Sequence, residues 1–300
     1  MKPKLPKTSK FVKSYCVEHG KDFRLKDIDP ADTQNVNLKE EARDFLAKGV
    51  ARLSDLQQTL YAQDQSAVLV ILQGMDGAGK DSVIRHVMSG VNPQGCEVYS
   101  FKQPSQEDLN HDFLWRASKL LPQRGRIGIF NRSYYEEVLV VRVHPELLRK
   151  EQIPRSIETK KIWKDRFEDI NSFENYLNRN GVLVRKFFLH LSKEEQRNRF
   201  LSRLDEPDKN WKFSEADVKE RERWEDYMQA YEDMIRHTAT PHAPWFVVPA
   251  DHKWFTRMVV ASVIIETLEN LHLTFPRVDE GKRKELDAAR ELLLNEARKA

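Results

Sequence analysis

The feature that most constrains the fold is a short apolar run that leads directly into a glycine-rich segment. Residues 67–72 read AVLVIL, without a polar side chain and with three β-branched residues. Such a run is typical of a strand buried on both faces, as in a parallel sheet. Residues 74–80 follow as GMDGAGK and open a predicted helix at about residues 81–88. This order predicts the first unit of a parallel α/β sheet.

The same alternation of patterns continues along the chain. Strands are predicted at residues 97–101, 127–130, 182–190 and 245–248, and helices at 38–60, 105–121, 157–180, 217–237 and 253–271. Ser105 with Asp108 forms a candidate capping box, Ser192 a candidate helix start, and Asn180 with Gly181 a candidate helix end. We therefore expect an α/β fold with three α/β/α layers, a parallel sheet, a helical lid and additional helices at both ends.

The domain organisation follows from the same patterns. We find no linker in the 300 residues, so a single domain over residues 1–300 is expected. Residues 1–35 mix charges, prolines and few apolar side chains, which predicts an irregular arm. The core is expected at residues 67–255, a lid at about residues 203–216, where helical periodicity breaks, and a charged helix at residues 276–300.

Composition excludes several classes of function. The net charge is only +3 at pH 7, and acidic residues interleave every basic cluster, which argues against nucleic-acid binding. No apolar run approaches the roughly 20 residues that cross a bilayer, and the basic first residues lack the apolar stretch of a signal peptide. Cys16 and Cys96 have no metal-type spacing and are interpreted as reduced thiols. We therefore predict a cytoplasmic protein with no membrane and no nucleic-acid partner.

Residues 74–80 fit the P-loop pattern G-x-x-x-x-G-K. The glycines allow successive backbone N–H groups to point into one concavity, the following helix adds its positive end, and Lys80 reaches phosphate oxygens as a point charge. The chain has only 11 glycines, so three within six residues favour a phosphate site over an ordinary strand-to-helix turn. The predicted phosphate-binding residues are Gly74, Gly77, Ala78, Gly79, Lys80 and Asp81.

Two carboxylates depart from the usual P-loop. Asp81 stands where Ser or Thr usually binds Mg²⁺, and Asp76 lies inside the loop, where a carboxylate repels phosphates. Asp76 makes sense if it faces a divalent cation or orients an attacking phosphate oxygen through one. The alternative is that Asp76 only accepts N–H hydrogen bonds from the turn. We favour the metal role and expect a Mg²⁺ cofactor, with Mn²⁺ as an alternative.

A second group follows the predicted strand at residues 127–130. Asn131 ends this strand, where an acidic Walker-B residue is usual, and the adjacent Arg132 can neutralise a transferring phosphoryl group. Glu136 or Glu137 can supply the missing carboxylate, but an acidic first helical turn also explains both, and for Glu136 we prefer that explanation. The prediction is therefore that Asn131 and Glu137 bind metal and that Arg132 is catalytic.

A third group of basic residues lies between residues 197 and 223, together with as many acidic residues. A solvated, salt-bridged surface is thus one interpretation. The non-periodic stretch with Trp211 and Phe213 among its cations is also typical of a mobile lid that closes over phosphates. For the lid interpretation, the predicted polyanion-binding residues are Arg199, Arg203, Lys209 and Lys212.

At these residues the sequence resembles the polyphosphate kinase 2 family, a P-loop family related in fold to thymidylate kinase. The similar segments span about residues 67–255 and read GMDGAGKD, VNPQG, FLWR, IFNRSYYEEVLVVRVHPE, KFFLHLSKEEQ, NWKFSEAD and APWFVVPAD. The resemblance implies a P-loop kinase-like fold and transfer of the terminal phosphoryl group of inorganic polyphosphate to ADP or AMP. Many members carry Asp where this chain has Asn131, and the Asn form is similar to class III members, which phosphorylate both nucleotides.

Carried over by position, the resemblance implies roles for individual residues. Asp76 would bind Mg²⁺ and act in catalysis, Arg132 would contact the transferring phosphoryl group, and Glu137 would assist the metal. Asn92 and Pro93 of the VNPQG segment are the candidates for binding the nucleotide base. The implied partners are inorganic polyphosphate and adenine nucleotides, with guanine nucleotides as an alternative, and the implied assembly is a dimer or tetramer.

Two rival functions remain open at this point. A nucleoside monophosphate kinase that uses ATP as donor shares the P-loop and the lid. A P-loop nucleotide switch or binding module belongs to another class, and it would want a Ser or Thr after Lys80, where this chain has Asp81.

Overall fold

The protein is built on a six-stranded sheet with the strand order β1-β6-β5-β2-β4-β3. The computed structural model describes residues 8–34, 36, 39–154, 156–157 and 161–297. The strands are β1 (Cys16–Val17), β2 (Ala67–Gln73), β3 (Cys96–Ser100), β4 (Ile127–Asn131), β5 (Val182–His190) and β6 (Trp245–Pro249). All neighbouring strands are parallel except β1, which pairs antiparallel with β6. The predicted parallel α/β sheet is confirmed, with an antiparallel edge strand added.

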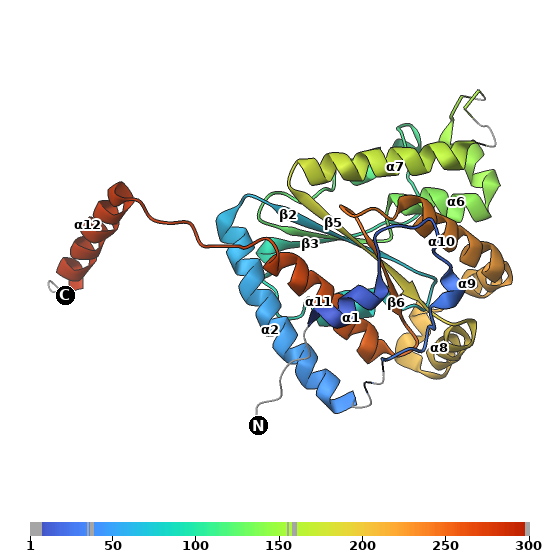
Figure 1. Ribbon diagram of the computed structural model, residues 1–300, viewed down its shortest axis with the longest axis horizontal. Coiled ribbons are helices and arrows are strands. Elements are labelled where there is room, and N and C mark those ends of the chain that lie inside the picture. The colour runs from blue at the N-terminus through green and yellow to red at the C-terminus, as the bar shows by residue number, and fades with distance from the viewer. Residues whose placement is uncertain (1–7, 35, 37–38, 155, 158–160, 298–300) are drawn as a thin grey trace.

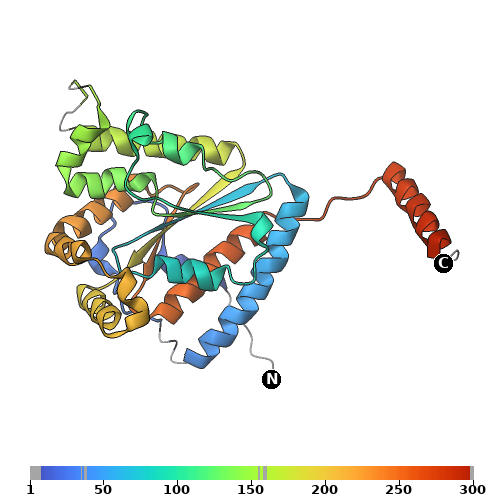
Figure 2. The ribbon, with the colours of Figure 1, turned by 180° about the vertical axis from the view of Figure 1, so that it is seen from behind.

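Helices cover both faces of the sheet (Figure 1, Figure 2). One face packs against α1 (Thr8–Tyr15), α2 (Lys39–Gln63), α3 (Lys80–Val87) and α11 (Lys253–Glu269). The other packs against α5 (Trp115–Ser118), α6 (Val140–Val143), α7 (Ile162–Arg179) and α10 (Trp224–Thr238). The remaining α-helices are α4 (Gln106–Leu109), α8 (Lys193–Asp205), α9 (Glu215–Glu220) and α12 (Glu280–Ala297). Short 3-10 helices are η1 (Leu25–Asp27), η2 (Pro93–Gly95), η3 (Tyr134–Val138), η4 (Pro145–Glu151), η5 (Pro207–Lys212) and η6 (Arg221–Arg223).

Strand β2 lies at the centre of the sheet, and all of its residues are buried. Successive side chains of a strand point to opposite faces. Val68, Val70 and Leu72 therefore enter the core under α2 and α11, whereas Leu69 and Ile71 enter the core under α7 and α10. Both faces need apolar side chains, which explains the unbroken apolar run in the sequence.

The strand order creates a crevice next to the carboxyl end of β2. From β2 the chain passes by way of β3 to β4 on one side and then crosses to β5 on the other side, so the direction of strand addition reverses at β2. In parallel sheets such a switch point opens a crevice outside the carboxyl ends of the strands. Leu72 of β2 is in register with Asn131 of β4, which brings the glycine-rich loop and the end of β4 to the same edge.

Two predicted elements need correction. Residues 105–121 form two short helices, α4 and α5, because the chain turns at Asp112, whose side chain accepts the Leu114 N–H. The capping box of Ser105 and Asp108 is confirmed at the start of α4. Residues 1–35 are not an irregular arm throughout. They contain α1, which buries Val12, and β1, which pairs with the edge of β6 that would otherwise stay open.

Helices in the last third of the chain also differ from the prediction. Residues 217–237 were expected as one helix but form the end of α9, then η6, then α10. The charged C-terminal helix is present as α12, which projects away from the body in both views (Figure 1, Figure 2). The single domain over residues 1–300 stays a prediction. Among the described helices, none combines the length and apolarity needed to cross a bilayer.

A fully buried ion pair joins the sheet to the helices of one face. Lys186 of β5 and Glu174 of α7 both have fully buried side chains, and Nζ lies 2.6 Å from Oε2. Lys186 also donates to the Thr238 carbonyl at 2.7 Å, and the hydroxyls of Tyr134 and Tyr135 each donate to Glu174 at 2.8 Å. Burying two charges is costly, but this dense set of partners offsets the cost as long as both partners are present.

We expect Glu174→Ala to lower the free energy of unfolding by about 3–5 kcal/mol, because it leaves the Lys186 ammonium buried without a counterion. Urea denaturation measures this change. The matched control is Glu168→Ala on the same helix, which removes an exposed ion pair with Lys164 and should cost less than about 1 kcal/mol. Equal effects of the two substitutions would contradict this role of the buried pair.

Candidate active site

The loop between β2 and α3 has the backbone shape of a phosphate-binding nest. Gly74, Gly77 and Gly79 have φ angles of 152°, 87° and 100°. A Cβ added to Gly74 would lie 3.0 Å from the Leu189 carbonyl oxygen, and a Cβ added to Gly77 would lie 3.2 Å from the Phe200 ring. Only glycine fits these positions without strain. The loop ends at Gly79, which is the N-cap of α3, so the positive end of that helix faces the same crevice.

Lys80, the first residue of α3, is folded back on the loop. Its Nζ donates to the carbonyl oxygens of Gly74 at 2.6 Å and Met75 at 3.3 Å and lies 4.0 Å from Asp76 Oδ1. Burial, reinforced by the charge of Arg132, lowers the pKa of Lys80 to about 8. A negative charge close to a buried ammonium favours its protonated form. An anion such as phosphate would supply that charge.

Asp76 is held by Arg132 and not only by the turn that carries it. Arg132 Nη2 lies 2.5 Å from Asp76 Oδ1, and Nη1 lies 3.2 Å from Glu136 Oε2. Burial alone would raise the pKa of Asp76, but the charges of Lys80 and Arg132 outweigh it, so the pKa lies below its usual value. Arg132 itself has a φ of 63°, a left-handed conformation that is uncommon outside glycine and clusters at functional sites.

Oxygen donors suited to a divalent cation gather beside the loop. Asn131 Nδ2 donates to Asp81 Oδ1 at 2.6 Å, while Asn131 Oδ1 is buried with no hydrogen-bond partner among the described residues. Proteins bind Mg²⁺ through one or two carboxylates together with substrate phosphates. Asp76, Asp81 and Asn131 fit this requirement. No cluster of three or more His, Cys, Asp or Glu side chains suited to a metal occurs within the part of the chain that the structure describes.

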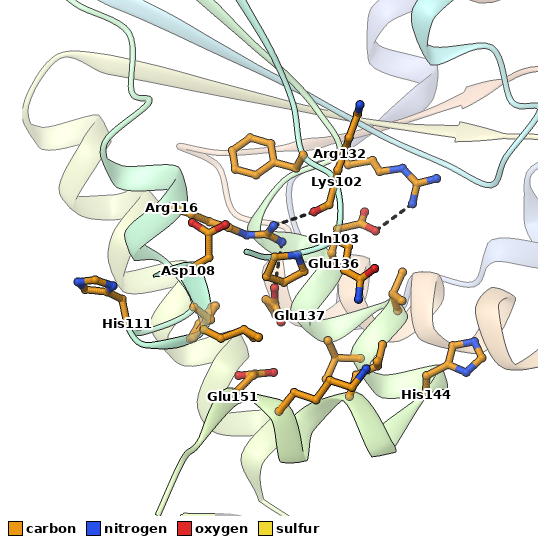
Figure 3. Close-up of a pocket in the computed structure, with 18 of the residues that line it drawn as sticks. Lys102, Gln103, Asp108, His111, Arg116, Arg132, Glu136, Glu137, His144 and Glu151 are labelled. Carbon is orange, nitrogen blue, oxygen red and sulfur yellow. Dashed lines mark hydrogen bonds and ion pairs between the residues drawn. The ribbon is translucent and has the colours of Figure 1, made fainter. Parts of the chain in front are cut away.

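A cavity of about 620 Å³ opens on the other side of Arg132. Figure 3 shows Arg132 and Glu136 in its wall, so the pair that holds Asp76 also borders the cavity. The lining combines apolar side chains such as Phe101 and Phe113 with charged ones such as Arg116. Cavities of this size and mixed lining are typical of small-molecule sites.

Arg116 of α5 is fixed at the wall of this cavity. Its guanidinium donates to the Lys102 carbonyl at 2.8 Å and to Glu137 Oε1 at 3.1 Å. Glu137 is buried, and Arg166 lies 3.8 Å from its other oxygen. Burial and the nearby Glu151 raise the pKa of Glu137 to about 7, although both arginines act in the opposite direction. These contacts hold the Glu137 carboxylate against Arg116 and Arg166, and its assistance to the metal stays a prediction.

The prediction that Asn92 and Pro93 bind the base is contradicted by their position. Both residues precede β3 and lie at the amino edge of the parallel strands, opposite the glycine loop. Asn92 instead uses its side chain to accept the Gln94 N–H at 3.0 Å. The residues that do line the cavity follow the carboxyl end of β3, beginning at Phe101. The general placement of ligands at that edge would have pointed to them.

The prediction that Arg199 binds a polyanion is also wrong. Arg199 is buried in α8, and its guanidinium has five N–H donors. They go to the carbonyl oxygens of Gly77 (2.9 Å), Ala78 (3.1 Å), Ala250 (2.6 Å) and Asp251 (3.0 Å) and to Glu195 Oε1 (2.8 Å). With every donor directed inward, Arg199 holds the glycine loop in place and has none left for a ligand.

Arg203 lies one turn further along α8, beside Phe200, which packs against Gly77. Its guanidinium lies over the Phe200 ring at 5.2 Å and 3.7 Å from Asp217 Oδ2, and its charge contributes to the low pKa of Asp76. Lys209 and Lys212 belong to η5, but their side chains lie outside what the structure describes. Their binding of a polyanion stays a prediction.

The fold and the site together define a P-loop protein of the kinase type. A glycine nest, a helix N-terminus and a buried lysine meet at the switch point of a parallel sheet, beside a cavity for a second ligand. The sequence model of the family Polyphosphate kinase 2 (PPK2) matches residues 36–276, and the chain belongs to this family.

Named relatives and a solved structure agree with this assignment. The chain is 55% identical over 257 residues to an ADP-polyphosphate phosphotransferase of Rhodopseudomonas palustris, covering 85% of this chain and 89% of the relative. It is 43% identical over 274 residues to an AMP/ADP-polyphosphate phosphotransferase of Meiothermus ruber, covering 91% of this chain and 98% of the relative. The crystal structure of polyphosphate kinase 2 from Arthrobacter aurescens superposes with a TM-score of 0.84 at 37% identity, covering 93% of this chain and 95% of the solved chain. The predicted family and P-loop kinase-like fold are confirmed.

Replacing Arg199 by Ala should destabilise the protein by about 3 kcal/mol or more, since several buried carbonyl groups lose their donors. Thermal or urea unfolding measures this loss. If Arg199 instead bound substrate at the surface, Arg199→Ala would leave the unfolding transition unchanged and only raise the KM for a polyanion. That second outcome would overturn the correction made above.

Proposed function

We propose that the protein transfers the terminal phosphoryl group of inorganic polyphosphate to ADP and to AMP in a Mg²⁺-dependent, reversible reaction. The observation that carries the proposal is the position of Arg132. This residue contacts Asp76 of the P-loop on one side and lines the cavity on the other, so two phosphate-bearing ligands would meet at its guanidinium.

The P-loop would hold the end of the polyphosphate chain. Terminal phosphate oxygens would accept hydrogen bonds from the loop amides and draw Lys80 away from the carbonyls of Gly74 and Met75. Arg203 of α8, whose charge helps to lower the pKa of Asp76, would add a further positive charge along the chain. Lys209 and Lys212 are proposed to extend this row of cations.

The cavity would hold the acceptor nucleotide. Its apolar side chains suit a base and a ribose, and Arg116 suits the phosphate nearest the nucleoside because a guanidinium binds phosphate oxygens in pairs. The Glu137 carboxylate and the Lys102 carbonyl fix that guanidinium before the nucleotide arrives. A preformed contact of this kind aligns the acceptor with the donor at little additional entropic cost.

The chemical step is an in-line displacement. An oxygen of the terminal phosphate of ADP or AMP attacks the terminal phosphorus of polyphosphate, and the bond from that phosphorus to its bridging oxygen breaks. The products are the nucleotide with one more phosphate and a polyphosphate chain one unit shorter. Both reactants are anions, so the main tasks of the protein are alignment and neutralisation of charge, for which Lys80 and Arg132 are placed.

Asp76, Asp81 and Asn131 are proposed to hold the Mg²⁺ ion, with Mn²⁺ as an alternative. The buried, unpartnered Asn131 Oδ1 and the carboxylate of Asp76 support this role. A bound Mg²⁺ would neutralise phosphate charge at this place. Asp76 would at the same time keep Arg132 oriented through their ion pair.

The relatives suggest which acceptors to expect. The names of the proteins from Rhodopseudomonas palustris and Meiothermus ruber both specify ADP and polyphosphate, and the second also specifies AMP. We propose that ADP and AMP are both substrates here and that adenine nucleotides are preferred to guanine nucleotides. We also propose a homo-oligomer, a dimer or a tetramer. The exposed leucines of α12, which include Leu292 and Leu293, support it because an isolated exposed helix is only marginally stable.

The wild-type protein should form ATP from ADP, Mg²⁺ and long-chain polyphosphate with no ATP added, and ADP from AMP under the same conditions. Chromatographic identification of the products measures this, and GDP in a parallel reaction tests base selection. Lys80→Ala and Asp76→Asn should each lower kcat by about a thousandfold or more, since each removes charge that acts on the transferring group.

The matched control for these two variants is Lys219→Ala, which removes an exposed lysine of α9 and should keep the wild-type rate. If no nucleotide forms from polyphosphate but AMP is phosphorylated by ATP, the protein is instead an ATP-dependent nucleoside monophosphate kinase. Near-normal rates in either P-loop variant would remove the proposed site.

A second prediction concerns the acceptor. Arg116→Lys should raise the KM for ADP by about tenfold while changing kcat much less, because lysine keeps the charge but loses the paired hydrogen bonds. Steady-state kinetics with varied ADP measures both constants. Lys119→Ala, one turn further along and partly exposed, is the control. An unchanged KM in Arg116→Lys would exclude Arg116 from the acceptor site.

A further inference from the structure

Helix α8 turns one face towards the P-loop. Gln196, Arg199, Phe200 and Arg203 recur at the spacing of a single helix face. Phe200 packs beside Gly77, Arg199 donates to the loop carbonyls, and the charge of Arg203 helps to lower the pKa of Asp76. Gln196 also contacts the P-loop, and the other end of its amide contacts Arg221.

Gln196 is buried, with 1% of its surface exposed, and both ends of its amide are engaged. Nε2 donates to the backbone carbonyl of Asp76 at 2.6 Å, and Oε1 accepts from Arg221 Nη1 at 2.6 Å. The orientation of the amide is fixed by chemistry, since a carbonyl only accepts and a guanidinium only donates. Gln196 therefore fits between these two partners in a single orientation.

Arg221 belongs to the segment that follows the bend after α8. We call residues 214–223 the lid segment; it comprises Ser214, α9 and η6 and overlaps the lid predicted at residues 203–216 only at its start. The lid segment contacts α8 through the ion pair of Asp217 with Arg203 and through the hydrogen bond of Arg221 to Gln196. Arg221 also donates to the Lys193 carbonyl at 3.0 Å, which holds it at the start of α8.

The loop partner of Gln196 is Asp76, whose carbonyl and carboxylate both have specific contacts. Asp76 directs its carboxylate to Arg132 and Lys80 while its carbonyl is held from behind by Gln196. A shift of that carbonyl rotates the peptide and moves the carboxylate. The contact from Arg221 through Gln196 thus connects the lid segment to the orientation of Asp76.

We propose that Gln196 is a positioning residue that couples the lid segment to the P-loop, so that Asp76 takes its working orientation when Arg221 is docked. A residue that only fills space in the core would also be buried, but it would not respond to Arg221, which is 25 residues away in the chain. The kinetic part of the test rests on the proposed function; amide exchange in the loop does not.

The test compares Gln196→Glu, Arg221→Ala, the double variant and the control Arg197→Gln. Glutamate at position 196 still accepts from Arg221 but has no N–H for the Asp76 carbonyl, and its charge repels that oxygen. Arg221→Ala removes the other end of the contact. Arg197 is the exposed neighbour of Gln196, and its replacement removes a positive charge without touching either hydrogen bond.

Hydrogen exchange of the amides of residues 74–80 is the first measurement. Exchange should be faster in both Gln196→Glu and Arg221→Ala, with the double variant no faster than Gln196→Glu alone, and unchanged in Arg197→Gln. In the polyphosphate assay, kcat should fall by about tenfold in Gln196→Glu and less in Arg221→Ala, with the KM for ADP within about twofold of wild type. The cavity that would bind ADP touches neither residue.

Two results would overturn the coupling. One is wild-type exchange in residues 74–80 in Arg221→Ala; the other is independent, additive effects of the two substitutions. Should Gln196→Glu fail to fold, Arg221→Ala and Arg221→Lys decide alone, because Arg221 is not in the core. If the wild-type protein does not use polyphosphate, the proposed function fails, whereas the exchange data still decide whether Gln196 couples the two segments.

Discussion

The site depends on a glycine loop that cannot keep its shape by itself. Three glycines with positive φ angles shape the loop, and Lys80 of α3 donates to the carbonyls of Gly74 and Met75. Helix α8 supplies donors for the carbonyls that follow. Arg199 donates to the carbonyls of Gly77 and Ala78, and Gln196 donates to that of Asp76. A buried carbonyl without a donor costs free energy, so this support from α8 is part of the phosphate site.

With the loop fixed, charge decides what the site can bind. Lys80 is buried and has a lowered pKa, and the nearest anion, Asp76, is already shared with Arg132. The buried ammonium of Lys80 beside Arg132 therefore favours an anionic ligand such as phosphate. The left-handed backbone of Arg132 directs its side chain between the loop and the cavity. One arginine can thus face both ligands of a transfer reaction, and the fixed guanidinium of Arg116 sits on the acceptor side.

Much of this arrangement was predictable from the sequence, because local patterns report local geometry. The apolar run, the glycine loop and Ser192 as a helix cap all have short-range causes, and all are found in the structure. What the sequence does not show is contacts between residues that lie far apart in the chain. Arg199 has the same charge whether it faces solvent or four carbonyls, and Glu137 gives no sign in the sequence of the two arginines that hold it. Asn92 precedes β3 and therefore lies at the amino edge of the sheet, away from the edge that binds ligands.

The most direct test of the account is the affinity of the protein for tripolyphosphate, measured by calorimetry near pH 7 with and without Lys80. If the loop at residues 74–80 is the anion nest, Lys80→Ala should bind tripolyphosphate at least about tenfold more weakly than the wild-type protein, since a buried, charge-assisted contact is lost. The same affinity in both proteins would show that phosphate binds elsewhere and would contradict the account.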